Sequence, residues 1–260
     1  MTVEEEIIHI LKTHYEKMIS LRGNRKEQEQ ENKKTNMFLK TTFQKNPQLI
    51  LNLFWKSYKT WIQLPEQERH KSPRYSDKLL WTIIDTPTKE AIDTACQIMI
   101  ESEDLYKETV ARFLGDSKNP KAVPYLIEAL KSDDYNVVSK SALALGDIGD
   151  SRAEPYLLEI VDKYNNDEVY SDGRIDDSYP IIRYNTFNAL CLLNTPAARK
   201  KILQSLFHDR DIGIQQRAIR YLVAEMQMEA VPYLEKLSES NHEEIATLAR
   251  NYLEKLDPNY

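Results

Sequence analysis

Residues 122–126 read AVPYL, residues 153–157 read AEPYL, and residues 230–234 read AVPYL again. The first two copies begin 31 residues apart and the third begins 77 residues later, which is two periods of about 31 plus an insertion of about 15. Self-similarity at this period is typical of a repeat array, in which each unit buries its apolar face only against its neighbours. The chain is therefore expected to form a solenoid.

The period extends beyond these three copies and divides residues 87–260 into five units. Residues 114–116 and residues 145–147 both read LGD, again 31 residues apart. Within a unit, apolar residues recur at spacings of three and four, as an amphipathic helix requires. We place the units at 87–118, 119–149, 150–194, 195–226 and 227–257, with the insertion at 163–178 of the third unit.

Start signals for the first helix of a unit recur at matching places, namely Asn119-Pro120, Asp150-Ser151 and Thr195-Pro196. A polar side chain can accept a hydrogen bond from the first turn, and a proline there lacks only a donor that would be unpaired anyway. The chain has six glycines and no long alternation of strand type. We therefore predict an all-α fold of about five two-helix units.

The unit at 119–149 resembles a known family. Its sequence AVPYLIEAL, followed by DD, VV and ALALGDIGD within residues 122–150, is similar to the short HEAT repeats of phycobilisome-lyase-type proteins. The resemblance is strongest in this unit, weak before residue 87, and covers about two-thirds of the chain. It implies a right-handed, armadillo-like α-solenoid whose second helices line a concave face, and it suggests bilin attachment or chromophore handling as one activity.

Residues 1–86 differ from the array and are expected to form an N-terminal helical cap region. Apolar spacing predicts helices over 3–21 and 49–64, and the polar stretch 22–34 is expected to be a charged loop or an exposed helix extension. This region holds most of the candidate aromatic contacts, Trp55, Tyr58, Trp61 and Trp81. They either seal the end of the array, which would otherwise expose its core, or form an interface for a partner.

The net charge of −6 is divided unevenly along the chain. Residues 1–86 carry 15 Lys/Arg and 11 Asp/Glu, whereas residues 87–260 carry 20 and 30, which gives about +4 and −10. An acidic array argues against nucleic acid as the ligand and suits a basic or polar protein partner, or a partner that charge does not attract. No stretch is long and apolar enough to span a membrane, and the acidic start does not resemble a secretory signal, so we expect a cytoplasmic protein.

The sequence contains no recognisable catalytic or metal-binding constellation. Phosphate loops, dinucleotide fingerprints and nucleophile elbows are missing, and the five histidines lack metal-ligand spacing. The acidic insertion does not have the ligand spacing of a calcium loop. No metal is expected, and no cofactor apart from a bilin under the activity that the resemblance suggests. Cys96 and Cys191 lie in apolar helical stretches and are predicted to be buried and structural.

Two groups of residues are candidates for contact with a protein partner. The insertion is one group, because insertions in repeat arrays commonly fall on the binding face; its candidates are Tyr170, Arg174, Asp176 and Asp177. The second helices supply aromatic and basic candidates, namely Tyr179, Arg183, Tyr184, Arg217 and Arg220. Their arginines would pair with carboxylates of a partner or with tetrapyrrole propionates. The alternatives are a solvated loop and ion pairs within the array.

We therefore expect a scaffold, adaptor or assembly factor that binds a protein through the concave face and residues 163–178. The first alternative, which the resemblance implies, is a phycobiliprotein bilin lyase or a chromophore-handling chaperone subunit. The second alternative is a self-assembling structural protein. The missing catalytic constellation favours a binding protein over an enzyme, and neither the partner nor the oligomeric state follows from the sequence.

Overall fold

The computed structural model describes residues 1–260 except 70, 103, 165–177 and 257–260. All regular secondary structure in this described part is helical, which confirms the predicted all-α fold. The chain divides into two compact units, Met1–Gln97 and Ile98–Tyr260, and the helix α6 (Lys89–Glu101) runs across the division.

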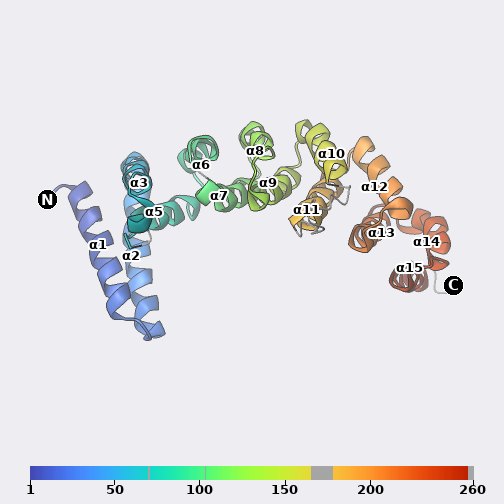
Figure 1. The fold of residues 1–260 in the computed structure, drawn as a ribbon, viewed down its shortest axis with the longest axis horizontal. Helices are drawn as coiled ribbons and strands as arrows, with labels where there is room; N and C mark the ends of the chain where they lie inside the picture. Colours follow the sequence, from blue (N-terminus) through green and yellow to red (C-terminus); the bar gives the residue numbers. More distant parts are fainter. Residues whose placement is uncertain (70, 103, 165–177, 257–260) are drawn as a thin grey trace. The chain divides into compact units, whose positions relative to one another are not determined.

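Five helices precede α6 in the unit Met1–Gln97: α1 (Val3–Ser20), α2 (Arg25–Lys45), α3 (Pro47–Ile62), α4 (Glu66–Arg69) and α5 (Tyr75–Ile84). Helices α1 and α2 form an antiparallel pair, α2 also packs against α3 and α5, and α3 packs against α5 (Figure 1). Their apolar faces share one core, in which Leu39, Phe54 and Ile83 are fully or almost fully buried. This core positions the groove described below.

The polar stretch 22–34 is mostly helical. The side chain of Asn24 accepts a hydrogen bond of 3.3 Å from the backbone N–H of Glu27 and so caps the N-terminus of α2. Further along the same helix, Thr35, Leu39 and Phe43 are buried and hold it against the rest of the unit. Residues 25–34 are therefore not the expected charged loop but the exposed first part of α2, a helix separate from α1, which ends at Ser20.

A buried histidine links α1 and α2. His14 is 5% exposed, and its Nδ1 lies 3.1 Å from the hydroxyl of Thr35. Burial lowers the pKa of His14 below its usual value of 6.5, and Lys78 and Lys17 lower it further, whereas Glu31 raises it. The neutral imidazole is therefore the form that the folded unit prefers.

This burial makes the stability of the unit sensitive to acid. The unfolded chain binds a proton on His14 at a higher pH than the folded chain does, so the free energy of unfolding falls as pH drops from about 7 to about 5. Urea titrations across that range should show a shallower pH dependence for His14→Asn than for the parent chain. His9→Asn, at an exposed position of the same helix, is the control and should leave the slope unchanged. Equal slopes for the parent and His14→Asn would contradict the prediction.

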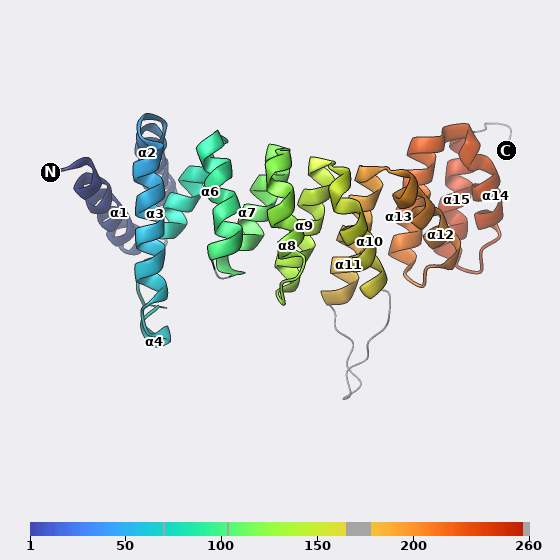
Figure 2. The same cartoon turned by 90° about the horizontal axis from the view of Figure 1, so that it is seen from above.

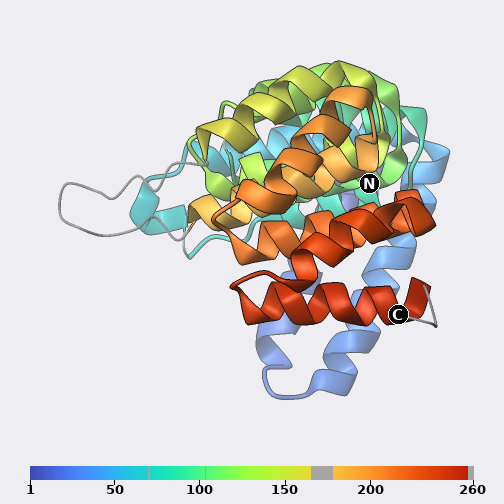
Figure 3. The same ribbon diagram turned by 90° about the vertical axis from the view of Figure 1, so that its right-hand side faces the viewer.

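The unit Ile98–Tyr260 is a series of two-helix repeats that lie side by side (Figure 2). The first helices are α8 (Val123–Ala129), α10 (Glu154–Lys163), α12 (Pro196–His208) and α14 (Val231–Ser238). The second helices are α7 (Asp104–Ser117), α9 (Tyr135–Ile148), α11 (Ser178–Leu193), α13 (Ile212–Met226) and α15 (Glu243–Leu256). From α9 onward, each second helix packs against the first helix of its own repeat and against a neighbouring second helix. Figure 3 shows one such repeat, α14 and α15, as an antiparallel pair in red.

The predicted start signals of the first helices are confirmed. Side-chain oxygens of Asn119, Asp150 and Thr195 accept hydrogen bonds of 3.0–3.2 Å from backbone N–H groups two or three residues later. In the AxPYL copies, the alanine and the leucine are fully buried, and the proline is exposed in the first turn. The repeated AxPYL sequence therefore has a structural role: it forms the start of a first helix and supplies buried residues to its packing face.

Each second helix from α7 to α13 is followed directly by a residue with a positive φ angle. The residues immediately after these helices are Lys118, Gly149, Asn194 and Gln227, with φ angles of 50°, 74°, 52° and 48°. Gly149, with ψ of 20°, has the left-handed helical conformation that stops a helix and lets the chain turn into the next repeat, whereas Gln227 has a ψ of −118°. Only one of the four is glycine, so the sequence alone gives a weak signal for these turns.

Candidate functional site

The second helices α7, α9, α11, α13 and α15 form one layer, here named the inner layer, on one side of the repeats in Figure 1. Small residues let these helices approach closely. A Cβ atom on Gly115 of α7 would lie 2.8 Å from the Cα of Ala144, and one on Gly146 of α9 would lie 2.6 Å from the Cα of Ala189. The repeated LGD phrase therefore has a packing role.

Polar side chains of α11 tie the inner layer together. The amide of Asn185 donates a hydrogen bond of 2.6 Å to the hydroxyl of Ser139 on α9. On the other side, the side-chain oxygen of Asn188 accepts a hydrogen bond from Nε of Arg217 on α13. Arg217, a predicted binding residue, therefore uses part of its guanidinium inside the array.

Arg183, another predicted binding residue, lies in a buried ion pair. Its guanidinium donates to the carboxylate of Asp209, which lies between α12 and α13, and the two side chains are 7% and 3% exposed. The same carboxylate accepts a hydrogen bond of 2.9 Å from the backbone N–H of Asp211. Arg183 is therefore occupied by the fold and does not face a partner in this conformation.

Arg220 is the predicted arginine that the structure leaves available. It is exposed on α13 and lines an open hollow of about 350 Å³ with residues of α15 that include Glu243, Thr247 and Asn251. Within the described part of the chain, its guanidinium has no hydrogen-bond or ion-pair partner, whereas the neighbouring Gln216 donates to Glu244 at 3.2 Å. The hollow therefore offers one unpaired cation beside two carboxylates.

Most of the predicted insertion lies outside the described residues, which is where Tyr170, Arg174, Asp176 and Asp177 fall. Helix α10 ends at Lys163 and α11 begins at Ser178. Nothing is described of the side chain of Tyr179, and Tyr184 is half-buried on α11 in the inner layer.

The predicted aromatic residues of the unit Met1–Gln97 divide between core and surface. Trp55 and Tyr58 pack with Phe54 on α3, with ring centroids 5.1 to 6.2 Å apart. Tyr58 is buried, Trp61 is half-buried, and Trp81 on α5 is 47% exposed. One part of the set thus serves the core, while Trp61 and Trp81 remain at the surface.

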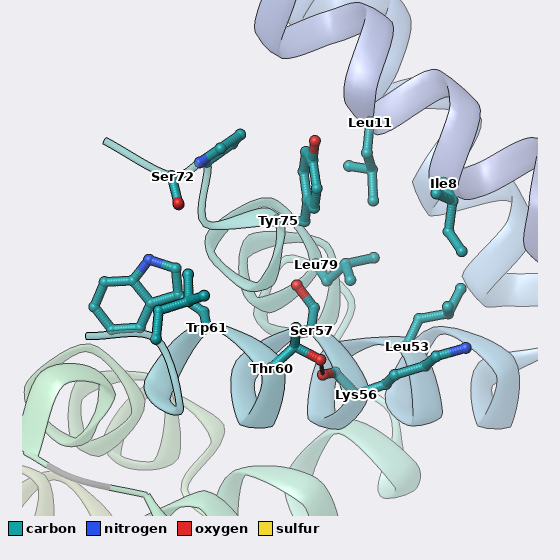
Figure 4. A pocket seen from close by; sticks show the side chains of 12 residues that line it. Ile8, Leu11, Leu53, Lys56, Ser57, Thr60, Trp61, Ser72, Tyr75 and Leu79 are labelled. Carbon is teal, nitrogen blue, oxygen red and sulfur yellow. Dashed lines mark hydrogen bonds between the residues drawn. The ribbon is translucent and has the colours of Figure 1, made fainter. Parts of the chain in front are cut away.

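Trp61 forms part of a groove between α1, α3 and α5, here named the α3 groove (Figure 4). It holds about 300 Å³. One wall is a single face of α3 and the residues just after it, since its members recur every three or four positions: Leu53, Lys56, Ser57, Thr60, Trp61 and Leu64. The remaining lining residues are Ile8, Leu11, Ser72, Pro73, Tyr75 and Leu79. Apolar side chains dominate the interior of the groove.

Charged groups surround this groove. Nζ of Lys56 lies 2.8 Å from the carboxylate of Glu4 and so connects α3 with α1. The guanidinium groups of Arg69 and Arg74 lie 5.7 Å and 5.1 Å from the centre of the Trp61 ring, within the range of cation–π attraction. The indole N–H of Trp61 is buried and finds no acceptor in the described part of the chain.

Burial also shifts the pKa of several groups. Desolvation, with the charge of Asp77, raises the pKa of Tyr15 to about 12, and its hydroxyl donates a hydrogen bond of 2.6 Å to the carbonyl of Arg74 beside the groove. Both cysteines are buried, as predicted, and burial raises the pKa of the Cys191 thiol to about 12. A thiol with that pKa stays protonated and is a poor nucleophile.

Among the described residues, no group of three or more His, Cys, Asp or Glu side chains is placed to hold a metal ion. None of the described helices combines the length and the apolar character needed to cross a membrane.

Residues 92–173 match the family of HEAT repeats. The match begins within α6 and ends within the insertion, and the two-helix repeats continue beyond it through α15. The predicted resemblance to HEAT repeats is confirmed, and the chain is an α-solenoid of HEAT-like repeats.

Two solved structures are similar to this chain. The complex of CpcE and CpcF of phycocyanin lyase from Nostoc sp. is 21% identical, with a TM-score of 0.49 over 81% of this chain and 77% of that one. Human deoxyhypusine hydroxylase in complex with glycerol is 18% identical, with a TM-score of 0.32 over 80% and 86%. No curated protein matches the chain. Bilin handling by this chain stays a prediction.

Sequence reasoning missed the partner of Arg183. Asp209 comes 77 residues after Ser132, and both side chains accept a hydrogen bond from the backbone N–H two residues later, at 2.9 Å and 3.0 Å. This equivalence could have marked Asp209 as a turn residue. Its ion pair depends on how neighbouring repeats pack, for which the sequence has no local signal.

Proposed function

We propose that the HEAT-repeat array is a protein-binding scaffold whose inner layer contacts the partner around Arg220. The observation that supports this most directly is the exposed, unpaired guanidinium of Arg220 in the hollow between α13 and α15. A guanidinium pairs strongly with a carboxylate because it can donate two parallel hydrogen bonds. The partner segment would therefore place an acidic side chain or a C-terminal carboxylate against Arg220.

The construction of the inner layer supports the same proposal. Hydrogen bonds from Asn185 and Asn188 join α11 to both neighbouring second helices. A surface that is already ordered loses less conformational entropy when a partner binds. Repeat arrays of this type commonly use such extended surfaces for binding. Glu243 and Glu244, on the opposite side of the hollow, would accept hydrogen bonds from polar or basic groups of the same segment.

Partner capture tests this proposal. The purified chain, immobilised and exposed to native lysate at low salt, is expected to retain a partner in stoichiometric amount. Arg220→Glu should reduce the retained partner by about tenfold or more, because it replaces an attraction with a repulsion. Lys200→Glu is the matched control, since it makes the same charge change at an exposed position of the first helix α12.

Retention of the partner by Lys200→Glu and its loss by Arg220→Glu would support the inner layer as the contact. Two outcomes would contradict the proposal. One is that no stoichiometric partner is retained by the parent chain. The other is that both charge reversals reduce retention equally, since net charge rather than the position of Arg220 would then control binding.

A further inference from the structure

The α3 groove has the dimensions of a helix-binding site. Its wall on α3 extends from Leu53 to Trp61, which at 1.5 Å per residue is about 12 Å, or a little more than two helical turns. Helices α1 and α3 both pack against α2, and close packing is not found between α1 and α3 themselves. Figure 4 shows α1 on one side of the groove, α3 on the other and Tyr75 and Leu79 of α5 between them.

The walls carry groups that the fold leaves unused. Leu64 and Ile8 are only partly covered, and Thr60 is exposed. The indole N–H of Trp61 is buried without an acceptor among the described residues. A buried donor without an acceptor is unfavourable for the folded state.

The charges around the groove favour an acidic occupant. Lys56 lines the groove, and Arg69 and Arg74 lie against Trp61 on its wall. Arg74 already pairs with Asp77 at 3.3 Å, whereas Arg69 donates to two backbone carbonyls, which leave its positive charge uncompensated. The carboxylate of Glu4 already pairs with Lys56 at 2.8 Å. This pair is substantially exposed, with 68% and 41% of its two side chains accessible, so another carboxylate can replace Glu4 at little cost.

We propose that the α3 groove binds an amphipathic α-helix of a protein partner. The apolar face of that helix lies between α1 and α3 and covers Trp61, and an acidic side chain beside that face replaces Glu4 at Lys56. In this kind of recognition, the apolar side chains at positions i, i+3, i+4 and i+7 of the bound helix pack into the groove. The groove lies within the unit Met1–Gln97, so this proposal does not rest on the contact proposed at Arg220.

Designed peptides provide the probe. A set of fluorescent helical peptides of about 15 residues carries Leu or Phe at i, i+3, i+4 and i+7, with glutamates beside the apolar face. A second set has the same apolar pattern with lysines in place of the glutamates, and a third has the glutamates with the apolar residues scrambled. Fluorescence anisotropy with the full chain is expected to give a micromolar Kd for members of the first set and at least tenfold weaker binding for the other two.

Two threonines provide a matched pair of variants. Thr60 lines the groove and Thr41 lies on α2, and both are exposed with their hydroxyls bonded at 2.8 Å to the carbonyl four residues earlier. Thr60→Arg should weaken binding of the glutamate peptides at least tenfold, whereas Thr41→Arg should leave it within twofold. Glu4→Gln should tighten binding about two- to threefold, because it removes the carboxylate that competes for Lys56.

Three results would overturn the proposal. The first is that no glutamate peptide reaches saturation below about 100 μM. The second is that Thr60→Arg and Thr41→Arg bind these peptides equally. The third is that dodecanoate binds the chain, is blocked by Thr60→Arg and displaces no peptide, because the groove would then be a site for an apolar carboxylate rather than for a helix.

Discussion

Asp209→Ala is expected to destabilise the unit Ile98–Tyr260 by about 3–5 kcal/mol, because it leaves the buried guanidinium of Arg183 without its counterion. The two side chains are 7% and 3% exposed, so water cannot replace the lost carboxylate. The Nε of Arg183 already lacks a partner within the described residues. The substitution also removes the acceptor for the N–H of Asp211. Urea unfolding followed by circular dichroism measures the loss as a lower midpoint.

Asp162→Ala is the control for this prediction. Asp162 pairs with Lys201 but is itself 61% exposed, and such surface pairs contribute about 0–1 kcal/mol. The double variant Arg183→Met with Asp209→Ala should recover much of the lost stability, since it removes the buried charge altogether. If Asp209→Ala costs no more than Asp162→Ala, the buried pair is not the source of stability that its geometry indicates.

Gly146→Ala is expected to destabilise the same unit by about 1–3 kcal/mol. In an open helix interior this substitution would stabilise by about 1 kcal/mol, because alanine has the higher helix propensity. Here the new Cβ would lie 2.6 Å from the Cα of Ala189, so that α9 and α11 must move apart. The sign of the effect therefore distinguishes packing from propensity, and urea midpoints measure it.

Gly213→Ala, in the first turn of α13, is the comparison variant, because the nearest atom to its new Cβ is a carboxylate oxygen of the capping residue Asp211 at 3.1 Å, which has to give way by only a few tenths of an ångström. Its expected effect is small. Combining Gly146→Ala with Ala189→Gly should restore part of the stability, since it takes a methyl group from the opposite side of the contact. A neutral or stabilising Gly146→Ala would show that the two helices are not held at this distance.

Most of the fold could be predicted from the repeat period, because the period is a local pattern in the sequence. The polar side chains of Asn119, Asp150 and Thr195 mark helix starts, with a proline directly after the first and the third, and the buried leucine of each AxPYL copy marks the face that packs. These features depend on neighbours within one repeat, so reading them needs no tertiary structure. The stretch 22–34 was harder, because its polar composition fits a loop and an exposed helix equally well.

The candidate sites could be predicted only in part. Arg183 and Arg220 look alike in the sequence, but packing between repeats buries the first against Asp209 and leaves the second exposed. The aromatic residues of α3 were expected at a cap or an interface, while the α3 groove itself was not expected. A groove depends on how far α1 stays from α3, and the sequence of neither helix specifies that separation.

The glycines of the inner layer also set its mechanical behaviour. The twelfth residues of α7, α9, α11 and α13 are Gly115, Gly146, Ala189 and Val223. Where backbone meets backbone, as at Gly146, no side chain can change rotamer to absorb a displacement. The array should therefore resist bending between α7 and α11 and yield more readily between α11 and α15, so that the Arg220 end can adjust to a partner while the other end stays rigid.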